Sequence, residues 1–269
     1  MRFLKIIIML LLMSCTAAEK QNKALIKTVA PIAPRYDSLT REFIVQCESD
    51  LLKSATVIGK DRLISSLSHL NVMDKGGRKY YLLEQDNITR MLNNLTSYPY
   101  SECILVDKNG KIVYTMRGGE PLGKKVSFYR ETPVYSMFLE GIKGNSVITD
   151  VVYVPQLAKE YNMFFSQPVI DLEGETQGVI VSAVSIERLA ERLPDFSRII
   201  NSSGFYSYHN IKELILKKDT VSERRLIDID AECVNRVKEV DGVYLYQQVH
   251  YKNIRWLIAV REKSSVVMN

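Results

Sequence analysis

Apolar residues recur every three or four positions in the part of the chain that follows a polar, proline-containing stretch. The spacing predicts a long helix that begins after Asp37 or Ser38, either of which can cap its first turn. A second helix is predicted over 80–95, after a loop at Lys75-Gly76-Gly77. The apolar face of the first helix and its continuation beyond a break at Gly59 would consist of Leu39, Phe43, Cys47, Leu51, Ala55, Ile58, Leu63, Ile64 and Leu67.

Near residue 100 the helical spacing gives way to short apolar runs that are typical of buried strands. Residues 103–106 and 112–115 are predicted strands, and the turn Asp107-Lys108-Asn109-Gly110 between them contains Asn-Gly, a strong hairpin signal. A helix is predicted over 133–142, with proline tolerated in its first turn. Three more strands are predicted over 146–153, 162–170 and 177–184, before a short helix over 186–193. This order of elements predicts an α+β fold.

A second, smaller set of elements follows Pro194. A strand is predicted over 205–208, a helical piece over 211–217, a helix over 230–237 and an antiparallel pair over 242–249 and 254–260. We therefore expect a helical segment over 37–79, a larger unit over 80–194 and a smaller unit over 195–269. Both units would be built on antiparallel sheets.

The chain begins with a short positive segment, an apolar run and a cysteine. The run over 6–13 is too short to span a bilayer, which takes about 20 residues, but it fits the core of a signal peptide. Leu12-Met13-Ser14-Cys15 resembles the lipobox of bacterial lipoproteins, in which a diacylglycerol is attached to the cysteine sulfur. The resemblance implies a signal peptide over 1–14, a lipid on Cys15 and a tether over 15–36. The alternative is an ordinary secretory signal with an incidental cysteine.

The composition is that of a globular protein, with 46% hydrophobic residues, 25% charged residues and a formal net charge of +5. Part of this charge belongs to Arg2 and Lys5 in the predicted signal peptide, so we do not expect nucleic acid as a partner. A lipid on Cys15 would hold the protein on the periplasmic side of a bacterial membrane. Thr16, rather than an aspartate, follows the cysteine, which favours the outer membrane.

Residue types that carry catalysis are few and scattered. His69, His209 and His250 have no neighbours at the spacing of a metal site or a triad, and no P-loop, dinucleotide or nucleophile-elbow motif occurs. We expect neither enzymatic activity nor a cofactor or metal. The other cysteines lack CxxC spacing and are expected to be packed thiols, or to include one disulfide: Cys47, Cys103 and Cys233.

Several segments, taken in order, carry a resemblance to a known family. ILVDKNGKIV (104–113) is similar to the opening hairpin of extracellular Cache domains, the PAS-like sensors of chemoreceptors and membrane kinases. SQPVID (166–171) resembles their closing hairpin, and SIERL (185–189) resembles the helix that leaves it. YHN (208–210) and WLIAV (256–260) fit the membrane-proximal half of a double Cache domain. The resemblance implies a long N-terminal helix beside two stacked PAS-like units, of which 80–194 is distal to the membrane.

The resemblance also implies a ligand pocket. Small ligands of that family usually bind in the distal unit, between the sheet and the loop-helix segment that covers it. Aromatic residues at such positions also suit half-buried strands, and a surface ion pair is the competing interpretation of Arg130. Mapped onto this sequence, the pocket would be lined by Tyr114, Tyr129, Arg130, Tyr135, Tyr153 and Phe165.

The sequence departs from amino-acid-binding members of the family at two places. Residues 130–135 read RETPVY, without the tryptophan of the family's Arg-x-Trp-Tyr segment. Ala183 stands at the position of the aspartate that holds the ligand's amino group. We therefore expect an anionic or neutral polar metabolite, and Arg130 suits a carboxylate because its guanidinium can donate two parallel hydrogen bonds.

The end of the sequence bears on how a signal would leave the protein. Chemoreceptors and sensor kinases continue into a transmembrane helix, whereas this sequence ends at Asn269, shortly after its last predicted strand. We therefore expect a sensor that passes its ligand state to a membrane partner such as a kinase, a cyclase or a chemoreceptor. The alternative is a structural or adaptor lipoprotein that keeps the fold, binds no ligand and uses its surface for contact with proteins.

Overall fold

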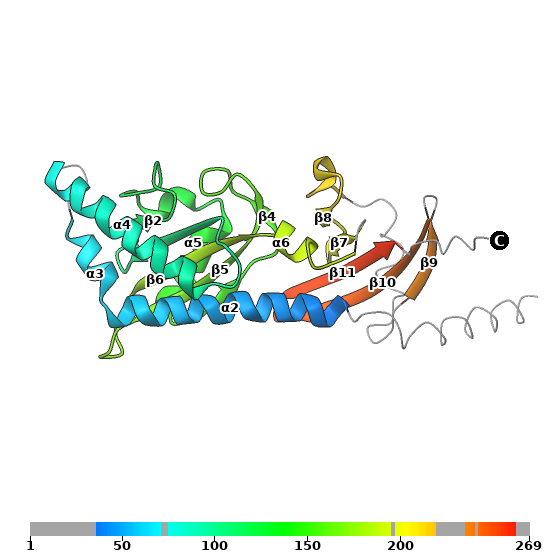
Figure 1. The fold of residues 1–269 in the computed structure, drawn as a ribbon, viewed down its shortest axis with the longest axis horizontal. Coiled ribbons are helices and arrows are strands. Elements are labelled where there is room, and N and C mark those ends of the chain that lie inside the picture. Colours follow the sequence, from blue (N-terminus) through cyan, green and yellow to red (C-terminus); the bar gives the residue numbers. More distant parts are fainter. Residues whose placement is uncertain (1–35, 71–74, 195–196, 219–234, 240–241, 262–269) are drawn as a thin grey trace, which may run out of the picture.

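The computed structural model describes residues 36–70, 75–194, 197–218, 235–239 and 242–261 (Figure 1). Cys15, the predicted signal peptide, most of the predicted tether and Cys233 lie outside these residues. Two antiparallel sheets follow one another along the long axis, and one helix runs beside both (Figure 1). Within the described ranges, none of the helices combines the length and apolar character needed to cross a membrane.

Among the described residues three helices precede the first sheet, and the longest of them, α2, packs on β5 of the first sheet and on β10 of the second. The residues of its predicted apolar face from Phe43 to Ile58 are buried, and Gly59 permits close contact because a Cβ there would lie 2.0 Å from the Ile170 carbonyl oxygen. The predicted loop at Lys75-Gly76-Gly77 is wrong, because these residues form the first turn of a helix. The packing of this helix therefore outweighs the low helix propensity of glycine, which costs about 1 kcal/mol per residue relative to alanine. The helices are α2 Tyr36–Lys60, α3 Leu63–Ser68 and α4 Lys75–Leu95.

The first sheet has the order β2-β1-β6-β5-β3, with β4 also paired to β5. The predicted hairpin is confirmed: Asp107 Oδ1 accepts hydrogen bonds from the N–H groups of Asn109 and Lys111, and Gly110 has a φ of 77°. The single strand predicted over 146–153 is wrong, because the chain leaves the sheet between Ile148 and Val152. The strands are β1 Glu102–Asp107, β2 Ile112–Thr115, β3 Val147–Ile148, β4 Val152–Tyr153, β5 Tyr161–Ile170 and β6 Thr176–Ser185.

Alternate residues of the first sheet pack into two separate apolar clusters. Cys103 and Leu105 face the side covered by α2, α3 and α4, which we call the helix face. Ile104 and Val106 face the side covered by the 3-10 helix η1 (Val126–Tyr129) and by α5 (Pro133–Ile142), which we call the cover face. The boundaries of α5 match the helix predicted over 133–142.

The second sheet has the order β8-β7-β11-β10-β9. Its strand β7, which lies between β8 and β11, is absent from the predicted elements because it is only four residues long and contains only two apolar residues, Ile199 and Ile200. The helix predicted over 230–237 is wrong over 235–237, which belong to β9; the rest lies outside the described residues. The short helices predicted over 186–193 and 211–217 are shorter in the structure, where they correspond to α6 and η2. The elements are α6 Glu187–Ala190, β7 Arg198–Asn201, β8 Tyr206–His209, η2 Lys212–Leu214, β9 Asn235–Glu239, β10 Gly242–Tyr251 and β11 Ile254–Arg261.

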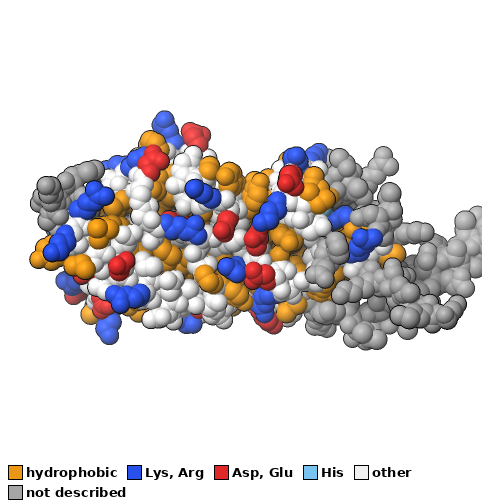
Figure 2. All heavy atoms as spheres, turned by 45° about the horizontal axis from the view of Figure 1, so that its top comes forward, with side chains coloured by type: hydrophobic (Ala, Val, Ile, Leu, Met, Phe, Trp, Pro, Cys, Tyr) orange, Lys and Arg blue, Asp and Glu red, His pale blue; other side chains and the backbone are white. Residues whose placement is uncertain are grey.

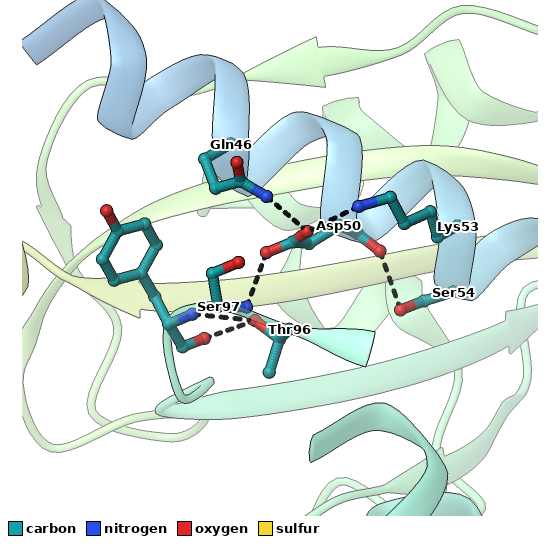
Figure 3. A network of polar contacts seen from close by, with 7 residues as sticks. Gln46, Asp50, Lys53, Ser54, Thr96 and Ser97 are labelled. Carbon is teal, nitrogen blue, oxygen red and sulfur yellow. Dashed lines mark hydrogen bonds and ion pairs between the residues drawn. The ribbon is translucent and has the colours of Figure 1, made fainter. Parts of the chain in front are cut away.

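Polar contacts of α2 fix the segments that pack on it. Asp50 is 1% exposed and accepts hydrogen bonds from Gln46, Lys53 and the Ser97 N–H, so it holds the loop between α4 and β1 against the helix (Figure 3). Glu48 holds the hairpin of the second sheet through Tyr251 and Lys252. The helix-face cluster also includes side chains of the second sheet, so one apolar core joins both sheets.

Candidate functional site

The six residues of the expected pocket do not come together in one place. Tyr114 and Phe165 lie in the helix-face cluster, on the opposite side of the sheet from η1 and α5. A bulge in β2 shifts the register between Leu105 and Val106, so Val113 and Tyr114 both face the helices and the alternation that starts at Ile112 is lost. Phe164, one residue before Phe165, is the residue of β5 that faces the cover.

Tyr114 is instead a core residue beneath α4. Its hydroxyl lies 2.8 Å from the Thr89 hydroxyl, and burial raises the pKa of the phenol. Tyr153 is also misplaced by the prediction, since it is 46% exposed and packs against Tyr161 with ring centroids 5.3 Å apart. Neither tyrosine can line a space beneath the cover.

Tyr129, Arg130 and Tyr135 do lie together, at the junction of η1 and α5. The Tyr129 side chain is buried in the cover-face cluster, and its pKa is raised by burial and by the negative charges of Glu120 and Glu102. Tyr135 is half-buried at the edge of the same cluster. Arg130 points outward and is 76% exposed, with Glu131 as an ion-pair partner at 3.8 Å. Two of the six predicted residues, Arg130 and Tyr135, therefore share a surface site.

The space between the first sheet and α5 is filled by apolar side chains. Ile104, Phe164 and Ala183 from the sheet, and Met137 from α5, are each no more than 2% exposed. Gly141 of α5 lies so close to the sheet that a Cβ on it would be 2.6 Å from a methyl carbon of Val179. Ala183 thus contributes to apolar packing at the position where an acidic residue would hold an amino group.

The outer surface of the cover holds a depression of about 720 Å³, which we call the cationic cleft. Lys125 donates to the Asn109 carbonyl oxygen at 2.7 Å and has no carboxylate partner among the described residues. Lys124 pairs with Glu120 and also lies 4.4 Å from the ring centroid of Phe128. On the face of the molecule that Figure 2 shows, positive and negative side chains are interspersed. The cleft is lined by Lys124, Lys125, Ser127, Phe128, Arg130 and Tyr135.

The chemistry of the cleft is that of an anion site with an aromatic wall. Three cations line it, and their ion-pair partners among the described residues are Glu120 and Glu131. The Phe128 ring is 65% exposed, so it can pack against an apolar part of a ligand. Both lysines and Phe128 are absent from the residues predicted to line the pocket. The available signal was the adjacent pair Lys124-Lys125, which lies three residues before Phe128.

A buried acid at the start of β1 is also absent from the predicted site residues. Glu102 is 4% exposed and pairs in register with Ala183. Its Oε1 accepts hydrogen bonds from the N–H groups of Cys103 at 2.8 Å and Met116 at 2.7 Å, while burial raises the pKa of the carboxyl group. Glu102 therefore fixes the point where the chain leaves β2 for the cationic cleft.

The cysteines and histidines of the described residues form no reactive centre. Cys47 and Cys103 are buried free thiols whose pKa values are raised by burial. His209 accepts a hydrogen bond from the Ile211 N–H through Nδ1. Within the described ranges, His, Cys, Asp and Glu side chains form no group of three that could hold a metal ion.

Solved structures share the arrangement described above. The sensor domain of the V. cholerae histidine kinase DctB is 12% identical, with a TM-score of 0.58 over 90% of this chain and 99% of that chain. The ligand-binding domain of the Pseudomonas fluorescens chemoreceptor CtaA, in complex with L-leucine, is 13% identical, with a TM-score of 0.56 over 92% of this chain and 97% of that chain. The fold of this chain is similar to the folds of that sensor domain and that ligand-binding domain. The α+β class with antiparallel sheets is thereby confirmed.

Another similar structure is an extracellular ligand binding receptor from Desulfohalobium retbaense, which is 14% identical, with a TM-score of 0.55 over 89% of this chain. The match spans only 39% of that receptor. No family model and no curated protein matches the sequence. At these identities the likeness concerns the fold, and the character of the site rests on the residues of this chain.

Proposed function

We propose that this protein is a membrane-anchored, extracytoplasmic sensor lipoprotein that binds a small anionic metabolite and passes its ligand state to a membrane partner. The observation that carries the proposal is the cationic cleft on the cover, where Lys124, Lys125 and Arg130 surround an exposed aromatic ring. The fold supports a sensing role, because similar structures are named as sensor and ligand-binding domains. The division into a distal unit over 80–194 and a proximal unit over 195–269 is part of the proposal.

The lipid anchor rests on the lipobox alone. Cys15 would carry the lipid, and the tether over 15–36 would hold α2 away from the bilayer. The absence of catalytic motifs from the sequence supports a role in binding rather than catalysis. A membrane kinase, a cyclase or a chemoreceptor would receive the signal.

Thermal unfolding of the mature protein with a panel of phosphate and mono-, di- and tricarboxylates tests the ligand class. A ligand at about 100 times its Kd adds about 2.7 kcal/mol of stability, and a domain of this size gains about 2–4 °C per kcal/mol. We expect Lys124→Ala and Arg130→Ala to abolish that shift. Lys143→Ala is the matched control, because Lys143 pairs with Glu140 beyond the cleft, at the end of α5. Equal shifts in all three variants would contradict the proposed site.

Mass spectrometry of the mature N-terminal peptide tests the anchor. A diacylglyceryl group on Cys15, lost together with membrane association in Cys15→Ser, is the expected result. An unmodified Cys15, or a signal peptide removed normally from Cys15→Ser, would instead support an ordinary secretory signal.

A second function is favoured by the packing beneath the cover. Because Ile104, Phe164, Ala183 and Met137 fill the space where the sequence predicts a ligand pocket, the second candidate function is that of a ligand-free adaptor, which acts through its surface. The adaptor would capture the same membrane partner whether or not an anion is present. Crosslinking to the partner that is unchanged by the anion panel and by Arg130→Ala would favour this second function over sensing.

A further inference from the structure

The break between β3 and β4 brings one acidic side chain into contact with the second sheet. Asp150 Oδ1 accepts a hydrogen bond from Trp256 Nε1 at 2.9 Å and another from the Ser207 hydroxyl at 2.9 Å. Trp256 belongs to β11 and Ser207 to β8, so one oxygen atom joins two strands of the second sheet to the first. In Figure 1 the second sheet follows the end of the first at β4 and α6.

The burial of the two donors makes this contact strong. Trp256 is 2% exposed and Ser207 is fully buried. Hydrogen bonds to an ionised acceptor are roughly twice as strong as those between neutral groups. Asp150 forms no ion pair with the described residues, so its charge is stabilised mainly by these donors and by the N–H of Val151. A neighbouring bond, from Asn253 Nδ2 to the Ile148 carbonyl oxygen at 2.9 Å, adds a second link.

The same loop is tied to the cover of the first sheet. Thr149 donates through its N–H to the Phe164 carbonyl oxygen, and its hydroxyl accepts from the Phe164 N–H, each at 2.9 Å. The Phe164 side chain packs in the cover-face cluster with Tyr129 and Met137. A displacement of η1 or α5 would therefore reach Asp150 through two hydrogen bonds and one packed ring.

We propose that Asp150 is a coupling residue, which transmits the position of the cover to the second sheet through Trp256 and Ser207. The contacts of Asp150 with the second sheet are observed independently of the proposed function. The coupling rests on the proposed function only for the event that displaces the cover, namely anion binding in the cationic cleft.

Trp256 makes the coupling measurable because it is the only tryptophan of the chain. The first experiment needs no ligand: hydrogen exchange of the full chain is compared for wild type, Asp150→Ala, Asp150→Asn and Ser207→Ala. We expect Asp150→Ala to raise exchange about tenfold or more in both β5 and β11, with smaller increases in the other two variants and a red shift of Trp256 emission.

The control is Asp86→Ala, which removes an exposed carboxylate on α4. Faster exchange confined to residues 149–152 would overturn the proposal, and if Asp150→Ala does not fold, the two milder variants decide.

The second experiment adds inorganic phosphate and follows Trp256 emission. We expect phosphate to change the emission of wild type, and to have no effect on Lys124→Ala or Asp150→Ala. If phosphate protects residues 124–135 from exchange but leaves Trp256 emission unchanged, the coupling is refuted while the anion site stands. If phosphate does neither, the proposed ligand class loses support and the exchange data alone decide the coupling.

Discussion

Removal of the Asp50 carboxylate should destabilise the protein by about 3 kcal/mol. Oδ2 accepts from the Ser97 N–H at 2.6 Å, and Oδ1 accepts from Gln46 at 2.7 Å and Lys53 at 3.2 Å (Figure 3). A hydrogen bond to a charged group contributes about 1.5–3 kcal/mol. The Lys53 side chain is 56% exposed, so its ion pair adds at most about 1 kcal/mol.

The measurement is thermal unfolding of Asp50→Ala beside Asp50→Asn and the exposed control Asp86→Ala. For a domain of this size, 3 kcal/mol corresponds to a lower Tm by about 6–12 °C. The asparagine keeps one acceptor oxygen in nearly the same place, so it should lose about half as much. If Asp50→Ala unfolds within 2 °C of Asp86→Ala, then the Ser97 N–H finds another partner and our account of the loop between α4 and β1 is wrong.

Three further predictions concern buried groups. Because burial raises the pKa of Glu102, the stability that its protonated form provides is present below about pH 4.5 and is lost as the pH rises through the raised pKa. Glu102→Gln should therefore gain stability relative to wild type as the pH is raised from 4.5 to 7. A difference in urea midpoint between the two proteins that stays constant over this range would contradict the prediction. Iodoacetamide should modify Cys47 and Cys103 only after unfolding, as peptide mass spectrometry can determine for each site, and rapid labelling of the native protein would disagree with their burial. Gly141→Ala should lower the Tm despite the better helix propensity of alanine, and the addition of Val179→Ala should restore part of it, since the new Cβ would meet the Val179 methyl groups.

Local signals predicted the elements of the first sheet well. The Asn-Gly turn fixed the hairpin at 107–110, and the proline near 133 marked the first turn of α5. Long apolar runs identified β5 and β6, because such strands are buried on both faces. The same reasoning failed for β7, whose four residues carry too little pattern to be distinguished from a loop.

The candidate site was less predictable, because each side chain had to be assigned to one face of a sheet. Phe164 and Phe165 are adjacent aromatic residues, and the sequence does not indicate which of them faces the cover. The bulge in β2 reverses the face of Tyr114 without any glycine or proline to mark it. A change of one residue in register moves a side chain from the cover to the helices.

The absence of an acid at position 183 shows how sheet register changes the interpretation of a single residue. Ala183 pairs with Glu102 on the next strand, so a carboxylate is present on the same face, one strand away. Its Oε1 accepts hydrogen bonds from the backbone N–H groups of Cys103 and Met116, so this oxygen holds the chain at the end of β2. The positive charge that the proposed anion would need lies at the outer surface, where Lys125 and Arg130 are exposed. An anion held there would contact the cover itself. The cover packs on the Phe164 ring, and Phe164 is hydrogen-bonded to Thr149, the residue next to Asp150.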